Sequence, residues 1–204
     1  ELIDNSIDAT STEIKIHLKK AGINQIIVKD NGHGMKNDNL IKCLERFATS
    51  KISKQNDLSN ISTLGFRGEA LPSIASVSKI KIKSLGKSIQ NYSKDNMRIV
   101  PSDIDLGTEI TVSNIFHNIP ARKKFLKSEA YEYKRILNTV KRFCIGYPNI
   151  SFTLTHNNKQ VIIVKEESLS SRISSILGNE YKKNLLSIES KKDSISMSGY
   201  IGNL

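Results

Sequence analysis

The chain opens with the stretch ELIDNSIDA at residues 1–9, and the prediction of its fold starts there. Ile3 and Ile7 lie four positions apart, which predicts an amphipathic helix. Residues at positions i, i+4 and i+7 share one face of a helix, and here they are a carboxylate, an amide and a second carboxylate: Glu1, Asn5 and Asp8. From spacing alone, this face is either a solvated helix surface or a polar site.

Beyond this helix, the apolar pattern changes to the two-residue period of half-buried strands. Residues 13–18 and 25–29 read as two such strands and as partners in a hairpin. Four further strands are expected at 79–83, 109–112, 150–155 and 160–164, and helices at 38–47, 120–145 and 172–177.

This mixture of elements predicts an α+β sandwich, with helices on one face of a mostly antiparallel sheet. The apolar stripe of the long helix would be formed by Phe125, Leu126, Ile136, Leu137 and Val140. The strongly apolar runs at 26–28 and 161–164 are far shorter than the roughly 20 residues that cross a bilayer. We therefore expect no membrane partner.

The net charge is weak evidence about partners. The 204 residues include 31 Lys or Arg and 20 Asp or Glu, which gives +11. Of the basic residues 24 are Lys, a bias that an AT-rich coding sequence would also produce. A nucleic-acid-binding protein and an enzyme with an unspecialised surface both fit this composition.

Two glycine-containing turns could hold a nucleotide. In DNGHG (residues 30–34), the carboxylate of Asp30 could accept hydrogen bonds from an exocyclic amine, and glycine would let a flat ring approach closely. In GFRGEAL (residues 65–71), glycines precede a helix, where backbone N–H groups and the helix dipole favour a phosphate. The GxxxxGK[ST] pattern of P-loop proteins does not occur.

Taken in order, these features resemble the GHKL ATPases, a superfamily that includes DNA gyrase B, a heat-shock chaperone, sensor histidine kinases and MutL. GFRGEAL and the stretch PARKKFL at 120–126 narrow the resemblance to MutL mismatch-repair proteins. The resemblance implies a GHKL (Bergerat-type) sandwich over residues 1–168. It also implies the start of an S5-like second domain at 169–204.

The resemblance further implies the roles of individual residues. Glu1 would be the general base for the attacking water, and Asn5 would be a ligand of Mg²⁺. Asp30 would hold the adenine amino group, with Gly32 and Gly34 shaping the site. The other expected ATP-binding residues are Thr49, Lys51, Gly65, Phe66, Arg67, Gly68, Ala70, Leu71 and Thr108.

Three positions depart from the family pattern, which usually has Glu at Asp4, Gly at Thr10 and His at Phe47. Thr10 is the most consequential, because a β-branched residue fits poorly if the turn after the first helix needs a positive φ. In the family, a segment before the first helix and a lysine of the second domain complete the site. We therefore expect this 204-residue chain to hydrolyse ATP weakly or not at all.

A basic cluster of eight cations lies within 21 residues: Arg122, Lys123, Lys124, Lys127, Lys134, Arg135, Lys141 and Arg142. It is either a solvated helix face or a surface for non-specific contacts with a DNA backbone, with Arg122, Lys123 and Lys124 as the expected contacts.

The leading functional hypothesis is an ATP-binding, slowly hydrolysing switch of MutL type, in which nucleotide drives dimerisation and mismatch-repair signalling. ATP and Mg²⁺ would be its cofactors. DNA, a homo- or heterodimeric MutL-type subunit and a mismatch-recognition protein would be its partners, in a bacterial cytoplasm or a eukaryotic nucleus. Two alternatives stay open: the ATPase domain of a type II topoisomerase, and a non-catalytic DNA- or partner-binding scaffold.

Overall fold

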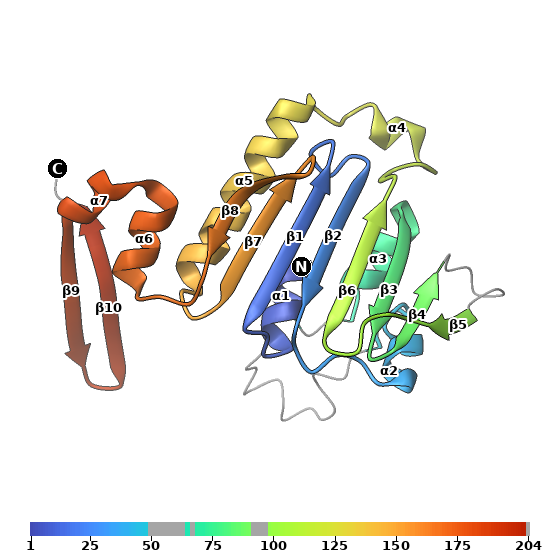
Figure 1. The fold of residues 1–204 in the computed structure, drawn as a ribbon, viewed down its shortest axis with the longest axis horizontal. Helices are drawn as coiled ribbons and strands as arrows, with labels where there is room; N and C mark the ends of the chain where they lie inside the picture. Colours follow the sequence, from blue (N-terminus) through green and yellow to red (C-terminus); the bar gives the residue numbers. More distant parts are fainter. Residues whose placement is uncertain (49–63, 66–67, 91–97, 203–204) are drawn as a thin grey trace.

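The computed structural model describes residues 1–48, 64–65, 68–90 and 98–202 (Figure 1). An eight-stranded sheet carries helices on one face, and a separate two-stranded sheet lies at the C-terminal end. The predicted α+β sandwich is confirmed. In the ranges described, no helix combines the length and apolarity needed to cross a bilayer.

The helices are α1 (Leu2–Asp8), α2 (Asn37–Lys42), α3 (Ala70–Val77), α4 (Pro120–Lys123), α5 (Glu129–Gly146), α6 (Leu169–Leu177) and α7 (Asn179–Lys183). The strands of the large sheet are β1 (Glu13–Lys19), β2 (Gln25–Asp30), β3 (Lys79–Ser84), β4 (Lys87–Gln90), β5 (Arg98–Pro101), β6 (Thr108–Ser113), β7 (Ser151–His156) and β8 (Lys159–Val164). The small sheet pairs β9 (Leu185–Lys192) with β10 (Ile195–Gly202).

The strand order of the large sheet is β5-β4-β3-β6-β2-β1-β7-β8. Only β1 and β7 run parallel among the pairs of this sheet in the described ranges, and the other neighbours are antiparallel. The two predicted hairpins, β1–β2 and β7–β8, are both present.

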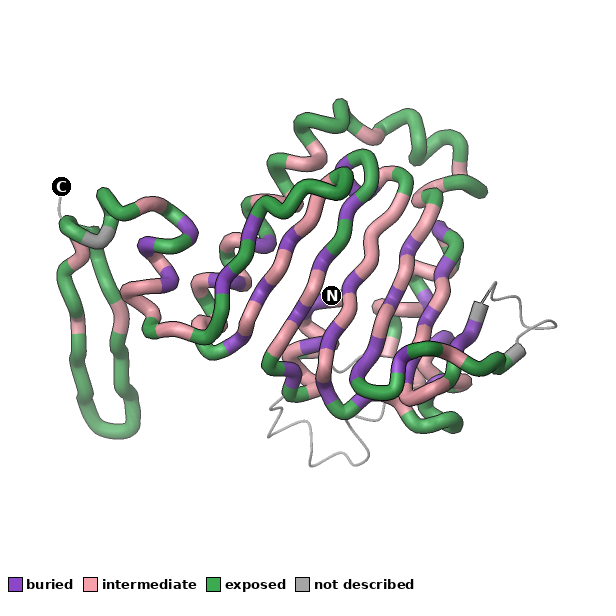
Figure 2. The backbone as a smooth tube through the Cα atoms, in the orientation of Figure 1, coloured by how far each residue is buried: buried purple, intermediate pink, exposed green. Residues whose placement is uncertain are grey.

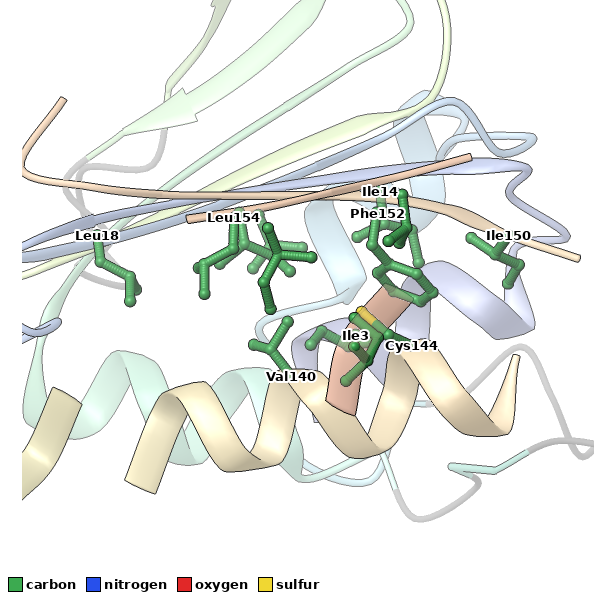
Figure 3. Packing of buried hydrophobic residues seen from close by; sticks show 13 residues of the cluster. Ile3, Ile14, Leu18, Val140, Cys144, Ile150, Phe152 and Leu154 are labelled. Atoms are coloured by element: carbon green, nitrogen blue, oxygen red, sulfur yellow. The ribbon is translucent and has the colours of Figure 1, made fainter. Parts of the chain in front are cut away.

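The core lies between the sheet and its helices. Register places one apolar residue from each of five adjacent strands in a single row on the helix-facing side: Leu154, Ile16, Val28, Ile110 and Ile82. Each of these residues is at most 6% exposed. Figure 3 shows Val140 and Cys144 of α5, with Ile3 of α1, packed beneath the side chains of β1 and β7.

The prediction of one helix over 120–145 is wrong in its first part. The chain forms α4, leaves helical structure, and begins α5 only at Glu129, where the hydroxyl of Ser128 accepts a hydrogen bond from the N–H of Tyr131. Such a cap starts a new helix. Phe125 falls between the two helices and is 79% exposed, so it does not belong to the apolar stripe.

A buried arginine fastens α6 to the sandwich. Arg172 has no exposed surface, and its guanidinium donates to the Glu167 carboxylate at 2.7 Å. It also donates to five backbone carbonyls at the end of α5, in the segment before β7 and directly after β8. These are the carbonyls of Cys144, Tyr147, Pro148, Ile150 and Lys165. A buried charge is tolerated when it is paired and fully hydrogen-bonded, as this one is.

The turn after α1 does require a positive φ. Thr10 adopts φ +58°, and its N–H donates to the carbonyl of Ile7. A left-handed conformation costs an L-residue roughly 1–2 kcal/mol, and a branched Cβ does not lower that cost. The departure from glycine at this position therefore leaves local backbone strain.

Replacing Thr10 with glycine should stabilise the protein. We expect Thr10→Gly to raise the free energy of unfolding by about 1 kcal/mol, because relief of strain exceeds the added entropy of the unfolded chain. Thr10→Ala keeps the left-handed Cβ and should gain less. Urea unfolding of the three proteins checks this, and a lower stability for Thr10→Gly would contradict it.

Candidate functional site

The candidate site lies where a row of the sheet changes from apolar to polar. On the helix-facing side, register aligns Phe152, Ile14, Asp30, Thr108 and Ser84 across adjacent strands. The first two are apolar core residues, whereas Asp30, Thr108 and Ser84 are buried polar ones. Three neighbouring strands, β2, β6 and β3, thus bring polar groups to one end of an otherwise apolar sheet face.

Asp30 is the only buried carboxylate in the described part of the chain, at 8% exposure. Its Oδ1 accepts hydrogen bonds from the N–H groups of Gly32 (3.0 Å) and Thr108 (3.2 Å), and the Ser6 hydroxyl lies 3.0 Å from Oδ2. Burial raises the pKa of the carboxyl above its ordinary value of 3.8, while these hydrogen bonds lower it. The outcome is a fixed acceptor in a poorly solvated position.

Gly107 allows β6 to approach this carboxylate. It adopts φ +74°, and a Cβ at this position would overlap the backbone of Asp30. Its own carbonyl accepts a hydrogen bond from Ser84 at 2.7 Å. Only glycine satisfies both the conformation and the space, so glycine at position 107 is a geometric requirement of the site.

Helix α1 supplies the second part of the site. Glu1 is exposed at its start, and Asn5 and Asp8 are half-buried one and two turns later. The Asp8 carboxylate accepts hydrogen bonds from the N–H groups of Leu64 (2.8 Å) and Gly65 (3.1 Å). This face of α1 is therefore not merely solvated: it connects to the start of the glycine-rich segment.

The glycine-rich segment leads into α3. Gly65 and Gly68 are half-buried, Gly68 lies against the backbone of Ala48, and α3 begins at Ala70 and Leu71. Gly32 and Gly34 are buried in the loop that leaves β2. Four expected ATP-binding residues lie outside the described residues: Thr49, Lys51, Phe66 and Arg67.

The expected DNA contacts lie elsewhere. Arg122, Lys123 and Lys124 are exposed on and just after α4, at the end of the sheet opposite Asp30 (Figures 1 and 2). Within the described ranges, no ion pair involves any of the eight cations of the basic cluster. Glu129 and Glu132 instead accept hydrogen bonds from Asn157 and the backbone of Lys127.

Sequence reasoning missed two hydroxyls of the site. Ser6 contacts Asp30, and Ser84 joins β3 to the Gly34–Met35 loop and to β6. Ser84 could have been suspected, because it comes after Ile80 and Ile82 at the next core-facing position of its strand. Ser6 offers no such signal, since a serine beside a polar helix face is ordinary.

Comparison with known proteins identifies the class. A family model described as "Histidine kinase-, DNA gyrase B-, and HSP90-like ATPase" matches residues 1–119, more than half of the chain. The chain therefore belongs to this family.

Within this family, the chain is similar to the DNA mismatch repair protein MutL. It is 39% identical to MutL of Chlorobaculum tepidum over 208 residues, which cover 99% of the chain and 33% of that protein. It is 41% identical to MutL of Coxiella burnetii over 211 residues, which cover 98% of the chain and 37% of that protein. The chain spans about a third of the length of these relatives.

Two solved structures have the same fold. One is "Crystal Structure of N terminal domain of a DNA repair protein", with a TM-score of 0.78 and 26% identity, covering 98% of this chain and 64% of that one. The other is "Aquifex aeolicus MutL ATPase domain complexed with ADP", with a TM-score of 0.67 and 26% identity, covering 93% and 69%. The sandwich is thus the GHKL fold that the sequence predicted.

The burial of Asp30 generates a pH-dependent prediction. The pKa of its carboxyl is higher in the folded than in the unfolded state, so its contribution to stability is present below pH 3.8 and is lost as the pH rises through the folded-state value. Asp30→Asn keeps an acceptor for the two N–H groups and removes the charge. We expect this variant to be more stable than the wild type at pH 7.

That advantage should shrink as the pH falls through the raised pKa of Asp30, because the wild-type carboxyl then loses its charge. Urea unfolding at several pH values measures it, with Asp38→Asn, at an exposed acid of α2, as the control. If the stability difference between Asp30→Asn and the wild type does not change with pH, the raised pKa of Asp30 is contradicted.

Proposed function

We propose that this chain binds ATP and hydrolyses it slowly, as the nucleotide-dependent part of a mismatch-repair switch of MutL type. The observation that carries the proposal is the buried Asp30 carboxylate, held by two backbone N–H groups and a hydroxyl at the polar end of the sheet. Its Oδ2 has capacity for a further hydrogen bond, because a carboxylate oxygen accepts more than one.

Asp30 would select adenine over guanine. The exocyclic amine of adenine can donate to a carboxylate, whereas guanine presents a carbonyl oxygen at the same edge. Two acceptors facing each other leave both unpaired, and an unsatisfied buried polar group costs about 1–3 kcal/mol. Gly32 and Thr108 donate to Asp30, Gly34 lies beside Ser84, and these residues would complete the adenine end.

The hydrolytic end would be formed by α1. Glu1 is an exposed carboxylate at the start of the helix and would accept a proton from the attacking water. Asn5, one turn later, offers an amide oxygen. Such an oxygen ligand suits Mg²⁺, which prefers oxygen ligands and takes most of them from phosphates and water. When bound, the ion would neutralise phosphate charge; the chain's part is to hold it through Asn5.

The glycine-rich segment would close over the phosphates. Asp8 connects α1 to the backbone of Leu64 and Gly65, so a change in this segment would act on the helix that carries Glu1 and Asn5. The proposed phosphate-end residues are Thr49, Lys51, Gly65, Phe66, Arg67, Gly68, Ala70 and Leu71. ATP would then act by stabilising the closed conformation.

The same proposal includes dimerisation with a MutL-type subunit, signalling from a mismatch-recognition protein, and DNA binding through the basic cluster. It divides the chain into an ATPase domain (1–168) and an S5-like domain (169–204). It places the protein with the DNA, in the cytoplasm of a bacterium. The relatives are named for mismatch repair, which supports this function over a type II topoisomerase.

Changing the proposed base separates binding from chemistry. Glu1→Gln keeps the size of the side chain but cannot accept a proton, so in the full-length protein we expect kcat to fall by roughly 10²- to 10⁴-fold. ATP affinity, measured by calorimetry, should hardly change. Asp4→Asn, at the other acid of the first turn, is the control. Equal loss of binding and turnover would point to a structural Glu1 and to a scaffold.

The basic cluster is tested by charge reversal. We expect Arg122→Glu with Lys124→Glu to weaken duplex DNA binding and to flatten its dependence on salt, since each phosphate contact contributes a slope of about 0.9. Lys191→Glu with Lys192→Glu, on the exposed β9, changes the net charge equally and serves as the control. Unchanged affinity and slope in the first variant would remove DNA contacts from this surface.

A further inference from the structure

Ser84 is a fully buried hydroxyl at the edge of the candidate site. It ends β3, has no exposed surface, and lies beside Thr108 in the polar row that also contains Asp30. Ile80 and Ile82 occupy the preceding core-facing positions of the strand. A polar residue at such a position requires partners, because an unpaired buried hydroxyl is costly.

Ser84 has three partners. The N–H of Met35 donates to its Oγ at 2.8 Å, the carbonyl of Gly107 lies 2.7 Å from Oγ, and the Thr108 Oγ1 lies 3.2 Å away. A hydroxyl has one proton and two lone pairs. The carbonyl can only accept, so the Ser84 proton goes to Gly107, and Thr108 must be the donor in the hydroxyl–hydroxyl contact.

This arrangement fixes the hydrogen-bonding character of Thr108. Its single hydroxyl proton is committed to Ser84, so only its lone pairs are available to a ligand. The backbone N–H of the same residue is committed to Asp30 at 3.2 Å. Thr108 and Asp30 therefore both present acceptors, and neither can donate to a carbonyl oxygen of a bound base.

We propose that Ser84 is a specificity-determining positioning residue: by taking the Thr108 proton, it makes the site accept a purine edge that donates hydrogen bonds and reject one that presents a carbonyl oxygen. This inference rests on the proposed adenine-nucleotide function and adds a second selecting group to Asp30. Ser84 acts through Thr108 rather than by touching the base.

The test compares ATP with inosine triphosphate, which has a carbonyl oxygen in place of the exocyclic amine. In Ser84→Ala, the Thr108 hydroxyl can rotate and donate to that oxygen. We expect the dissociation constant for inosine triphosphate, divided by that for ATP, to fall by about fivefold, which corresponds to one ordinary hydrogen bond. Ser84→Thr, which retains a hydroxyl, should keep the wild-type ratio.

Two controls separate positioning from general destabilisation. Ser88→Ala removes a hydroxyl that is 1% exposed on the adjacent strand β4, and it should leave the ratio unchanged. Ser88 Oγ is also the one buried side-chain polar atom without a hydrogen-bond partner in the described ranges, so its removal should not harm folding. Thr108→Val removes the hydroxyl through which Ser84 acts.

The double variant Ser84→Ala with Thr108→Val should have the same ratio as Thr108→Val alone, because residue 84 affects the ratio only through the Thr108 hydroxyl. Additive effects, or equal weakening of both nucleotides by Ser84→Ala, would overturn the proposal and leave Ser84 a structural residue. A wild-type protein that binds neither nucleotide would instead overturn the proposed function itself.

Discussion

The shape of the candidate site depends on holding one carboxylate in place where water hardly reaches it. Asp30 meets this requirement through donors from three separate segments: Ser6 on α1, Gly32 in the following loop and Thr108 on β6. Each donor must be held in place, which accounts for the left-handed Gly107 and for the register of the strands around it. The geometry of the site is therefore set by the same strand pairing that forms the sheet.

Much of this organisation could be predicted from the sequence. The two-residue alternation marked β1, β2, β3, β6, β7 and β8, because in a two-layer sandwich one face of each strand must be apolar. The short strands β4 and β5 escaped prediction: each has only four residues, too few for a period to emerge. The polar face of α1 and the DNGHG turn could be singled out because their residue types and spacings suit a nucleotide.

The features that escaped prediction depend on contacts distant in the sequence. The serine that pairs with Asp30 is 24 residues away, and Ser84 meets Met35 across 49 residues. Phe125 fits a helical period equally well whether or not the helix is interrupted, and only the cap at Ser128 decides it. Thr10 shows the converse: comparison with a family pattern indicated where the backbone would be strained, and the turn has φ +58° there.

The buried guanidinium of Arg172 also determines how α6 is attached to the sandwich. Because Arg172 is hydrogen-bonded to five carbonyls and a carboxylate, it holds α6 against the sandwich, although the proposed boundary at residue 169 assigns this helix to the second domain. α6 ends at Leu177, Gly178 follows with φ +113°, and the Ser174 hydroxyl donates a hydrogen bond to Asn179 Oδ1 at 2.7 Å on the far side of this glycine. A force on the β9–β10 hairpin would therefore reach the sandwich through the backbone at Gly178 and through this hydrogen bond, because Arg172 holds α6 in place.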